Sequence, residues 1–540
     1  MGRWASSPSP RLTVGPGGYL VDAVSSVGDI TTGDTGHLPI DERAVSEKAR
    51  RGFTWSLANS LVRRVWTFAL GLLLARLLAP ADFGVYAMAL TTLTVLQSMN
   101  ELGTTVALVR WQGDPSRAAR TATTIAISVS VGLYAFVFAL APALAGFFET
   151  PEAATVIRIL TVAVVFDGMC GVPNALLERA FLQRKRVVAD FSAVAVNAAV
   201  SVGLAVAGLG PLALAWGIVA GNLVGALLII WLSPSRPRPA FHRDDARRLL
   251  EVGLPLAGAS LLVFLMLNVE YVFIGGALDA EALGFYVLAF NISSWPSNLL
   301  TAAIRSVSIP AFALLVGDPG RLRTRFIEIF RLVMIFALPA SGLLAVLAHR
   351  VVEVLYGTTW LASGGVLMVL ASVGVARVAL DLCYDLLVAM GRSRTVMWLQ
   401  ALWVGALVPV LVMGTRGQGI RGAALAHLLV VAVVMVPAYA VVLRRVGIPL
   451  PRLARTLRRP LAAAAIMGIV VYALDRAMSG GLVGLLVAAV AGAVMYAALV
   501  VPWHGGRPEF RSLARPIRET DSPTADGDGA GPGVPPALTP

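Results

Sequence analysis

The sequence contains few charged residues for its length. Asp, Glu, Lys and Arg make up 14% of the 540 residues, whereas soluble domains carry about 25%. Hydrophobic residues account for 57% of the chain, and the mean hydropathy is +0.77. This composition excludes an ordinary soluble globular domain and indicates a protein that spans a membrane.

Cysteine is also scarce. Cys170 and Cys383 both lie in apolar stretches, which excludes a disulfide framework and a cysteine-based metal site. The histidines are scattered, and His349 and His427 have no neighbouring residues that complete a ligand set. The sequence GQGIRG at residues 417–422 matches a dinucleotide-binding pattern, but no strand pattern precedes it. We therefore expect no cofactor and no metal.

Long apolar runs follow one another between residues 53 and 503. A helix needs roughly 20 mostly apolar residues to cross a bilayer core about 30 Å thick. Dividing the runs at charges, prolines and glycines gives about fourteen candidate transmembrane helices. The predicted fold class is an all-α polytopic membrane protein.

The formal net charge of +13 comes mainly from arginines in short connections between apolar runs. Basic residues concentrate in alternate connections, as is typical of cytoplasmic loops. These connections are residues 110–120, 178–186, 233–248, 317–325, 391–394 and 444–459. The opposite connections contain only Arg350, Arg416, Arg421 and Arg476. The pattern indicates membrane topology rather than nucleic-acid binding, and both termini are expected in the cytoplasm.

One hairpin pattern occurs twice, as LARLLAPADFGVYAMA at residues 74–89 and as IGGALDAEALGFYVLA at residues 274–289. Asp82 and Asp279 can cap the helices that follow the turns, and glycine allows close helix approach. Six predicted spans separate the copies, so both have the same orientation. This predicts two lobes related by a pseudo-two-fold axis along the membrane normal. We expect the hairpins to serve packing and turn formation.

A second pair of similar segments supports this division. GLGPLALAWG at residues 208–217 opens the sixth span, and QGIRGAALAH at residues 418–427 opens the twelfth. The last two helices then extend a six-plus-six core. The predicted organisation is a disordered cytoplasmic extension (1–44), an N-lobe (45–233), a cytoplasmic linker (234–248), a C-lobe (249–443), a linker with two helices (444–503) and a disordered cytoplasmic tail (504–540).

Ionisable residues inside the spans are candidate functional residues, because a charge at the bilayer centre costs about 2.5 to 3.5 kcal/mol. Arg377, Asp381 and Asp385 follow one another at four-residue intervals and share one face of the tenth span. One hypothesis is a pyrophosphate or sugar site, in which arginine binds phosphate and the carboxylates bind sugar hydroxyls or a coupling ion. The alternative is an internal salt-bridge ladder.

Other spans add candidates for the same cavity. Arg63 and Arg64 are adjacent and point about 100° apart, so one of them is expected to face the cavity. Glu101 and Asp167 are expected to be helix-packing partners instead. The predicted substrate-binding residues are Arg63, Arg64, Glu270, Arg305, Arg377, Asp381 and Asp385.

With these features placed, residues 45–445 resemble the polysaccharide flippases of the multidrug/oligosaccharidyl-lipid/polysaccharide (MOP) superfamily, close to the O-antigen and colanic-acid exporters. The segments that carry the resemblance are RGFTWSLANSLVRR, ADFGVYAMALTTLTVLQSMNELGTTVALVR, ALLERAFLQRKR, LGFYVLAFNISSWPSNLLTAAIRSVSIPAFALL and VVEVLYGTTWLASGGVLMVL. They contain no catalytic signature. The resemblance therefore covers most of the apolar region as a pattern, without fixing individual substrate residues.

The resemblance implies a two-lobed bundle in a bacterial cell membrane that alternates between inward-open and outward-open states. Its cargo would be an undecaprenyl-pyrophosphate-linked oligosaccharide, moved from the inner to the outer leaflet for cell-surface polysaccharide biosynthesis. The implied partners are this substrate, membrane lipids, a coupling ion (H⁺ or Na⁺) and other polysaccharide-assembly proteins, with no nucleic acid.

Two alternatives remain at this point. A cation-coupled multidrug antiporter of the same superfamily shares the two-lobed plan, but arginines in the spans favour an anionic cargo. A membrane polysaccharide polymerase or ligase needs a substantial outer segment. The longest outer connection expected here, residues 349–363, has about fifteen residues. The sequence thus favours a transporter over an enzyme.

Overall fold

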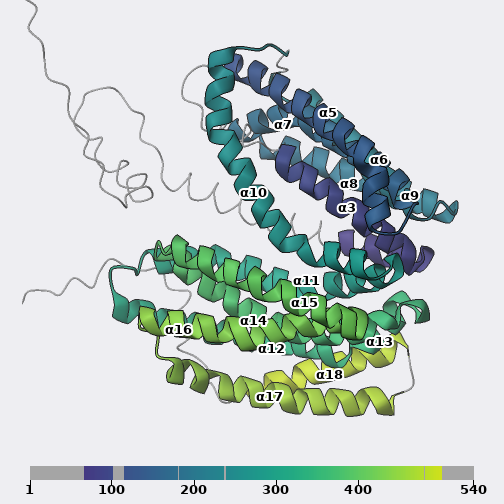
Figure 1. Cartoon of the computed structure of the whole chain (residues 1–540). Coiled ribbons are helices and arrows are strands. Elements are labelled where there is room, and N and C mark those ends of the chain that lie inside the picture. Colours follow the sequence, from purple (N-terminus) through teal and green to yellow (C-terminus); the bar gives the residue numbers. More distant parts are fainter. Residues whose placement is uncertain (1–65, 101–114, 181, 236–238, 479–480, 501–540) are drawn as a thin grey trace, which may run out of the picture. The chain divides into compact units, whose positions relative to one another are not determined.

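The computed structural model describes residues 66–100, 115–180, 182–235, 239–478 and 481–500. Within these ranges the regular structure is helical and no strand occurs (Figure 1). Nine helices among the described residues are long and apolar enough to cross a membrane. The predicted all-α polytopic fold is confirmed, whereas the count of about fourteen spans stays a prediction.

The first half of the described chain is organised around one helix. Its helices are Trp66–Leu77, α3 (Pro80–Asn100), α5 (Pro115–Phe147), α6 (Ala153–Thr161), α7 (Ala163–Arg179), α8 (Gln183–Val206) and α9 (Pro211–Leu232). α3 contacts α5, α6, α7 and α9, and a buried apolar cluster that includes Leu93, Ile157 and Leu160 joins it to its neighbours. α8 and α9 pack closely because Gly217 and Gly221 admit the facing backbone of α8.

The second half contains longer helices. They are α10 (Arg243–Ala277), α11 (Ala280–Ala313), α12 (Pro319–Val346), α13 (Ala348–Tyr356), α14 (Ala362–Ala389), α15 (Ser393–Leu429), the π-helical turn η2 (Val430–Met435), α16 (Val436–Val446), α17 (Leu450–Ala477) and α18 (Leu482–Val500). A buried cluster that includes Phe312, Phe326, Leu386 and Met435 joins α11, α12, α14 and η2. α10 contacts α3 and α5 as well as α11 and α15.

The last two helices, α17 and α18, lie side by side and pack on α12 (Figure 1). Met467 and Tyr496 are buried where they meet. Arg350 of α13 pairs with Asp475 at 2.8 Å and donates a second bond to the Asp475 carbonyl. The boundaries proposed for the lobes and the terminal pair stay a prediction.

The repeated hairpins contact each other. A Cβ at Gly84 of α3 would collide with the carbonyl oxygen of Ala280, and a Cβ at Gly284 of α11 would collide with that of Pro80. Glycine is therefore required at both positions for α3 and α11 to approach this closely. The predicted role of the glycines is consistent with this geometry.

Both predicted acidic residues cap a helix. Asp82 lies inside the first turn of α3, whereas Asp279 lies directly before α11. Asp82 accepts a hydrogen bond from the Ala79 backbone N–H at 2.9 Å. Asp279 accepts one from the Ala282 backbone N–H at 2.7 Å. Counted from the shared glycine, Ala79 corresponds to Asp279 and Asp82 to Ala282. The same two positions are thus joined in each hairpin, with the carboxylate supplied from opposite ends.

The second pair of similar segments shares one backbone feature. The residues that match are Gly210 and Gly419, whereas the alignment by sequence pairs Gly210 with Ile420. Gly210 has φ 55° and ψ −133°, and Gly419 has φ 58° and ψ −136°. Because such backbone angles favour glycine, Gly419 ends the helical run at 393–417 and the chain turns before residue 420. α15 therefore contains the eleventh predicted span and the start of the twelfth, which continues through η2 into α16, and the glycine of GQGIRG serves this turn.

Three helix boundaries differ from expectation. Residues 349–363 are largely helical, because α13 occupies Ala348–Tyr356 and a 3₁₀ turn follows at Thr358–Trp360. α10 begins at Arg243, inside the expected linker, where Asp244 and Asp245 in the first turn favour a helix N-terminus. α17 begins at Leu450, ten residues before the apolar run that predicted it.

Candidate functional site

The predicted site residues fall into two sets. Arg63 and Arg64 lie outside the described residues, as does Glu101. Glu270 lies on α10, Arg305 on α11, and Arg377, Asp381 and Asp385 on α14. The structure therefore places the describable candidates on three helices, of which α11 contacts both others.

The acids of α14 are bound by α11. Asp385 is buried and pairs with Arg305, whose Nε lies 3.0 Å from the carboxylate. Ser308 donates a second hydrogen bond to Asp385 at 2.9 Å, and Thr301 donates one to Asp381 at 3.0 Å. Thr301, Arg305 and Ser308 are spaced to share a helix face. We name Thr301, Arg305, Ser308, Asp381 and Asp385 the aspartate cluster.

Thr301 and Ser308 were missed by sequence reasoning. Hydroxyl residues inside an apolar helix usually bond their own backbone, so they attract little notice. Their spacing on either side of Arg305, at four and three residues, was the available signal. They show that the carboxylates of α14 bind across to a second helix.

Arg377 is placed differently from the two acids on its own helix. Within the described ranges no carboxylate lies within 4.0 Å of its guanidinium. Instead the guanidinium lies over the Phe290 ring of α11, 6.0 Å from its centroid. The internal ladder considered from the sequence is therefore not formed by Arg377 with Asp381. Arg377 presents a guanidinium in the middle of a spanning helix without an ion-pair partner in the part of the chain described.

A second acid-bearing group lies on α10, α11 and α15. His427 Nε2 is 2.7 Å from a Glu270 carboxylate oxygen, and the Tyr286 hydroxyl donates to the same carboxylate at 3.1 Å. His427 Nδ1 lies 3.3 Å from the Ala423 carbonyl, which requires a proton on Nδ1. We name Glu270, Tyr286 and His427 the glutamate cluster.

Sequence reasoning missed the hydrogen-bonded partner of His427. Glu270 is far from His427 along the chain, so no local spacing could reveal the contact. Tyr286 belongs to the second Gly-x-Tyr hairpin, and its hydroxyl contacts a candidate site residue. The second hairpin thus contributes to a polar cluster in addition to packing.

The described first half contains a smaller polar contact. Gln97 of α3 donates to Asp167 of α7 at 2.7 Å, and the Asn100 amide lies 3.4 Å from the Val164 carbonyl. Asp167 therefore joins two helices, as its predicted role as a packing partner requires.

A reciprocal contact joins the helix Trp66–Leu77 to the last turn of α13 and to the 3₁₀ turn that follows it. Arg76 donates at 2.7 Å to the Leu355 carbonyl and at 2.7 Å to that of Val354. In return, the Trp360 indole N–H donates at 2.7 Å to the Ala75 carbonyl. Each side thereby satisfies carbonyl groups that a helix C-terminus leaves without an intrahelical partner.

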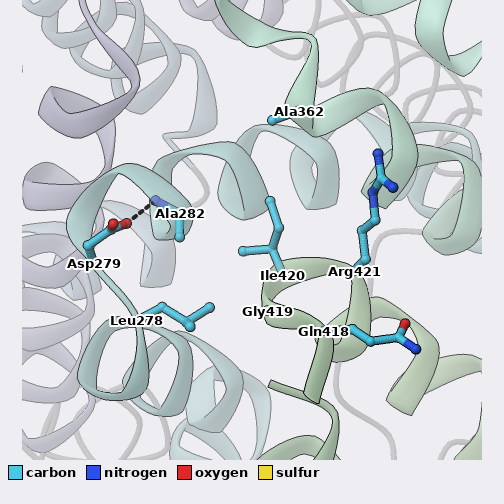
Figure 2. A pocket seen from close by; sticks show the side chains of 8 residues that line it. All are labelled: Leu278, Asp279, Ala282, Ala362, Gln418, Gly419, Ile420 and Arg421. Carbon is cyan, nitrogen blue, oxygen red and sulfur yellow. Dashed lines mark hydrogen bonds between the residues drawn. The ribbon is translucent and has the colours of Figure 1, made fainter. Parts of the chain in front are cut away.

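An open cavity of about 420 Å³ lies beside the second hairpin. Figure 2 shows the turn of this hairpin on one side and the glycine turn of α15 on the other. Its lining residues are Leu278, Asp279, Ala282, Ala362, Gln418, Gly419, Ile420 and Arg421. None of the residues of the aspartate or glutamate cluster lines it, so this cavity is separate from the charged groups between the helices.

The fold matches solved transporter structures. The lipid II flippase MurJ in an inward closed conformation aligns with a TM-score of 0.69 at 13% identity, over 84% of this chain and 100% of that one. An inward-facing multidrug resistance MATE family transporter aligns with a TM-score of 0.56 at 17% identity, over 71% and 94%. The class is thereby defined: a multi-pass membrane protein with the fold of MOP superfamily transporters.

The family follows from the sequence comparisons. The model of the polysaccharide biosynthesis protein family matches residues 73–364, and the chain belongs to this family. It is 26% identical to the succinoglycan biosynthesis transport protein ExoT of Rhizobium meliloti, over 77% of this chain and 85% of that protein. It is 24% identical to the lipopolysaccharide biosynthesis protein WzxC of Escherichia coli, over 75% and 82%.

These findings confirm the family resemblance and the prediction of a transporter rather than an enzyme. The chain is a multi-pass bacterial membrane protein. The family match covers α10 and α11, which carry Glu270, Tyr286 and Arg305, and ends at the start of α14.

Proposed function

We propose that the chain is a flippase that moves a lipid-linked oligosaccharide, with undecaprenyl pyrophosphate as the carrier, from the inner to the outer leaflet of the cell membrane. Its product would serve cell-surface polysaccharide biosynthesis. The names of ExoT and WzxC, which refer to succinoglycan transport and lipopolysaccharide biosynthesis, support this assignment. So does the fold shared with a lipid II flippase.

Arg377 is the observation that carries the proposal. A guanidinium in a spanning helix is costly to bury and normally faces a cavity or a partner. Within the described residues no carboxylate lies within 4.0 Å of the Arg377 guanidinium, and the fork geometry of a guanidinium fits phosphate oxygens. The pyrophosphate of the cargo would occupy this position during transport, with the glycan beside it and the prenyl chain in lipid.

The transport cycle proposed is alternating access between two lobes, residues 45–233 and 249–443. The concentration of arginine in alternate connections supports a cytoplasmic location for both termini. Arg305 would also contact the cargo, since its side chain remains about half exposed (47%) while it binds Asp385. Arg63 and Arg64 would supply further positive charge from the first span.

The glutamate cluster is the proposed site of ion coupling. Glu270 and His427 can each release or bind a proton, and their side chains are only 5% and 9% exposed. The groups that face them are Tyr271 on α10, Tyr286 on α11 and Arg377 on α14. A proton is favoured over Na⁺ because the His427 ring nitrogen already occupies the carboxylate at 2.7 Å, and imidazole is a poor ligand for a hard cation.

A cation-coupled multidrug antiporter is the second candidate, and the MATE fold similarity favours it. The two functions differ in the charge they require. A drug cation would be repelled by Arg377, whereas a pyrophosphate would be attracted.

Deletion of the gene in the host, followed by a leaflet-resolved assay of the lipid-linked glycan, tests the proposal. We expect the glycan to accumulate on the inner leaflet while its synthesis continues. Normal arrival at the outer leaflet would disprove the flippase function. A matched measurement of drug accumulation in the same strain separates the antiporter, which predicts increased retention of cationic drugs and unchanged glycan distribution.

A further inference from the structure

The turn between α16 and α17 carries a dense group of arginines. Arg444 and Arg445 lie in the last turn of α16, and Arg452, Arg455 and Arg458 lie in the first turns of α17. All five side chains are exposed. We name these five residues the α16–α17 arginine patch.

The first turn of α12 adds to this patch. A Cβ at Gly447, in the turn, would collide with the Arg323 guanidinium, so the Arg323 side chain lies directly against the turn backbone. Gly447 has φ 88°, a left-handed conformation that ends α16. The neighbouring acids of α12 are already engaged, since Asp318 pairs with Arg321 and Glu328 with Arg325.

No acidic residue occurs in the sequence between Arg444 and Leu474. The arginine patch is therefore not neutralised by its own segment. By contrast, the basic start of α10 contains Asp244, Asp245 and Glu251, and Arg247 pairs with Glu251 at 3.0 Å. Two inner connections of similar arginine content thus differ in net charge.

The geometry of α17 places the patch at the level of lipid headgroups. α17 has 28 residues and is about 42 Å long, which exceeds the hydrocarbon core of about 30 Å. Along its axis Arg455 and Arg476 are about 31 Å apart. The uncharged segment between Arg459 and Asp475 lies in the hydrocarbon, so the first turns of α17 extend toward the headgroup layer.

The same face of α17 exposes large apolar side chains. Leu461, Ile469 and Tyr472 are large apolar side chains with exposed fractions of 49%, 70% and 51%. They follow Arg458 at intervals of three, eight and three residues, which keeps them near one helix face. A lipid whose chains cover this face would have its headgroup beside Arg455 and Arg458.

From this arrangement we propose that the α16–α17 arginine patch binds an anionic phospholipid of the inner leaflet. The phosphate would accept charge-assisted hydrogen bonds from the arginines, while the acyl chains lie on the exposed apolar face of α17. This lipid is a resident of the protein surface and is distinct from the transported cargo. The inference does not depend on the proposed flippase function.

Native mass spectrometry of the full chain, titrated with phosphatidylglycerol and with phosphatidylcholine, tests the proposal. We expect phosphatidylglycerol to bind at about tenfold lower concentration. The variant with Arg452→Gln, Arg455→Gln and Arg458→Gln should lose this preference. The same three positions changed to Lys should retain most of it, since charge is preserved.

A control with Arg243→Gln, Arg247→Gln and Arg248→Gln at the start of α10 should keep the preference. Equal loss in both glutamine variants, or an unchanged preference in the α17 variant, would overturn the proposal. If undecaprenyl pyrophosphate binds more tightly than phosphatidylglycerol and this binding is lost in the α17 glutamine variant, the patch belongs to the cargo. That result would also overturn the proposal. If the α17 variant does not fold, salt provides a second test on the wild-type protein. Its preference for phosphatidylglycerol should fall when salt is raised, because exposed charges are screened. A preference that does not depend on salt contradicts the proposal.

Discussion

The glutamate cluster and the aspartate cluster both hold a buried carboxylate beside a basic group, but they differ in access. In the glutamate cluster both partners are enclosed, with Glu270 5% and His427 9% exposed. In the aspartate cluster Asp385 is 1% exposed, whereas Arg305 is 47% exposed. The first cluster is a closed pair, and the second turns its basic group toward open space.

This difference separates two roles that a transporter needs. A closed pair can change its protonation and thereby change how three helices pack, but it cannot contact a large cargo. A half-exposed arginine held by a buried acid can contact cargo while its orientation is fixed. Arg377 lies near both groups, because it is four residues before Asp381 on α14 and its guanidinium lies over Phe290, whose ring stacks with that of Tyr286.

The largest effect on export is expected from replacing Arg377, which lies between the two clusters. Arg377→Ala removes a phosphate-binding group, and we expect export to fall roughly 10- to 100-fold, the range for hydrogen bonds to charged groups. Leaflet-resolved export assays with protein levels normalised by immunoblot provide the measurement. Arg377→Lys should lose less, since charge remains while the fork is lost. Arg421 lies beside the open cavity of Figure 2, and Arg421→Ala is the matched control. Export by this variant should be normal. Similar export by the Arg377→Ala and Arg421→Ala variants would show that Arg377 is not part of the site.

Breaking the aspartate cluster should have the next largest effect, on stability. Asp385→Asn leaves Arg305 without its ion-pair partner and weakens the bond from Ser308. Because Arg305 is half exposed, water compensates part of this loss, and we expect a destabilisation of about 1 to 3 kcal/mol. Thermal unfolding in detergent measures it. Asp381 accepts its hydrogen bond from the neutral Thr301, so Asp381→Asn should destabilise the protein less. Equal destabilisation by both substitutions would show that the ion pair with Arg305 contributes nothing to stability.

The helices and hairpins could be predicted from sequence because apolar runs, glycines and acidic caps are local signals. The helix α13 was missed because it is short and lies within what reads as a connection. The partners of Asp381, Asp385 and Glu270 could not be predicted, since contacts across helices depend on rotation about each axis. The four-residue spacing on α14 identified a shared face correctly, yet gave no means of knowing that α11 supplies the partners.

The smallest effect on total export is expected from changes to the glutamate cluster. There the pH dependence of export should change instead. His427→Gln keeps a neutral hydrogen-bonding group beside Glu270 but removes the imidazole, which can carry a proton. We expect the dependence of export on pH to flatten, with maximal export reduced only several-fold. Export into vesicles at a series of pH values measures this.

Tyr286→Phe is the control for the closed pair. It removes one hydrogen bond to Glu270 and should cost about 1 kcal/mol of stability while the pH profile is retained. A His427→Gln protein with the wild-type pH profile would exclude the glutamate cluster as the coupling site. A flattened profile in both variants would instead indicate a general loss of packing around α10.

The contact between Gly84 and Gly284 constrains how the two copies of the hairpin can evolve. Equivalent residues of a repeat that touch one another lie beside the axis relating the copies. Each glycine meets the backbone of the other hairpin, so a larger residue at one position cannot be relieved by a smaller residue at the other, where glycine is already present. The two positions therefore constrain each other, because a side chain larger than glycine at either one would push α3 and α11 apart.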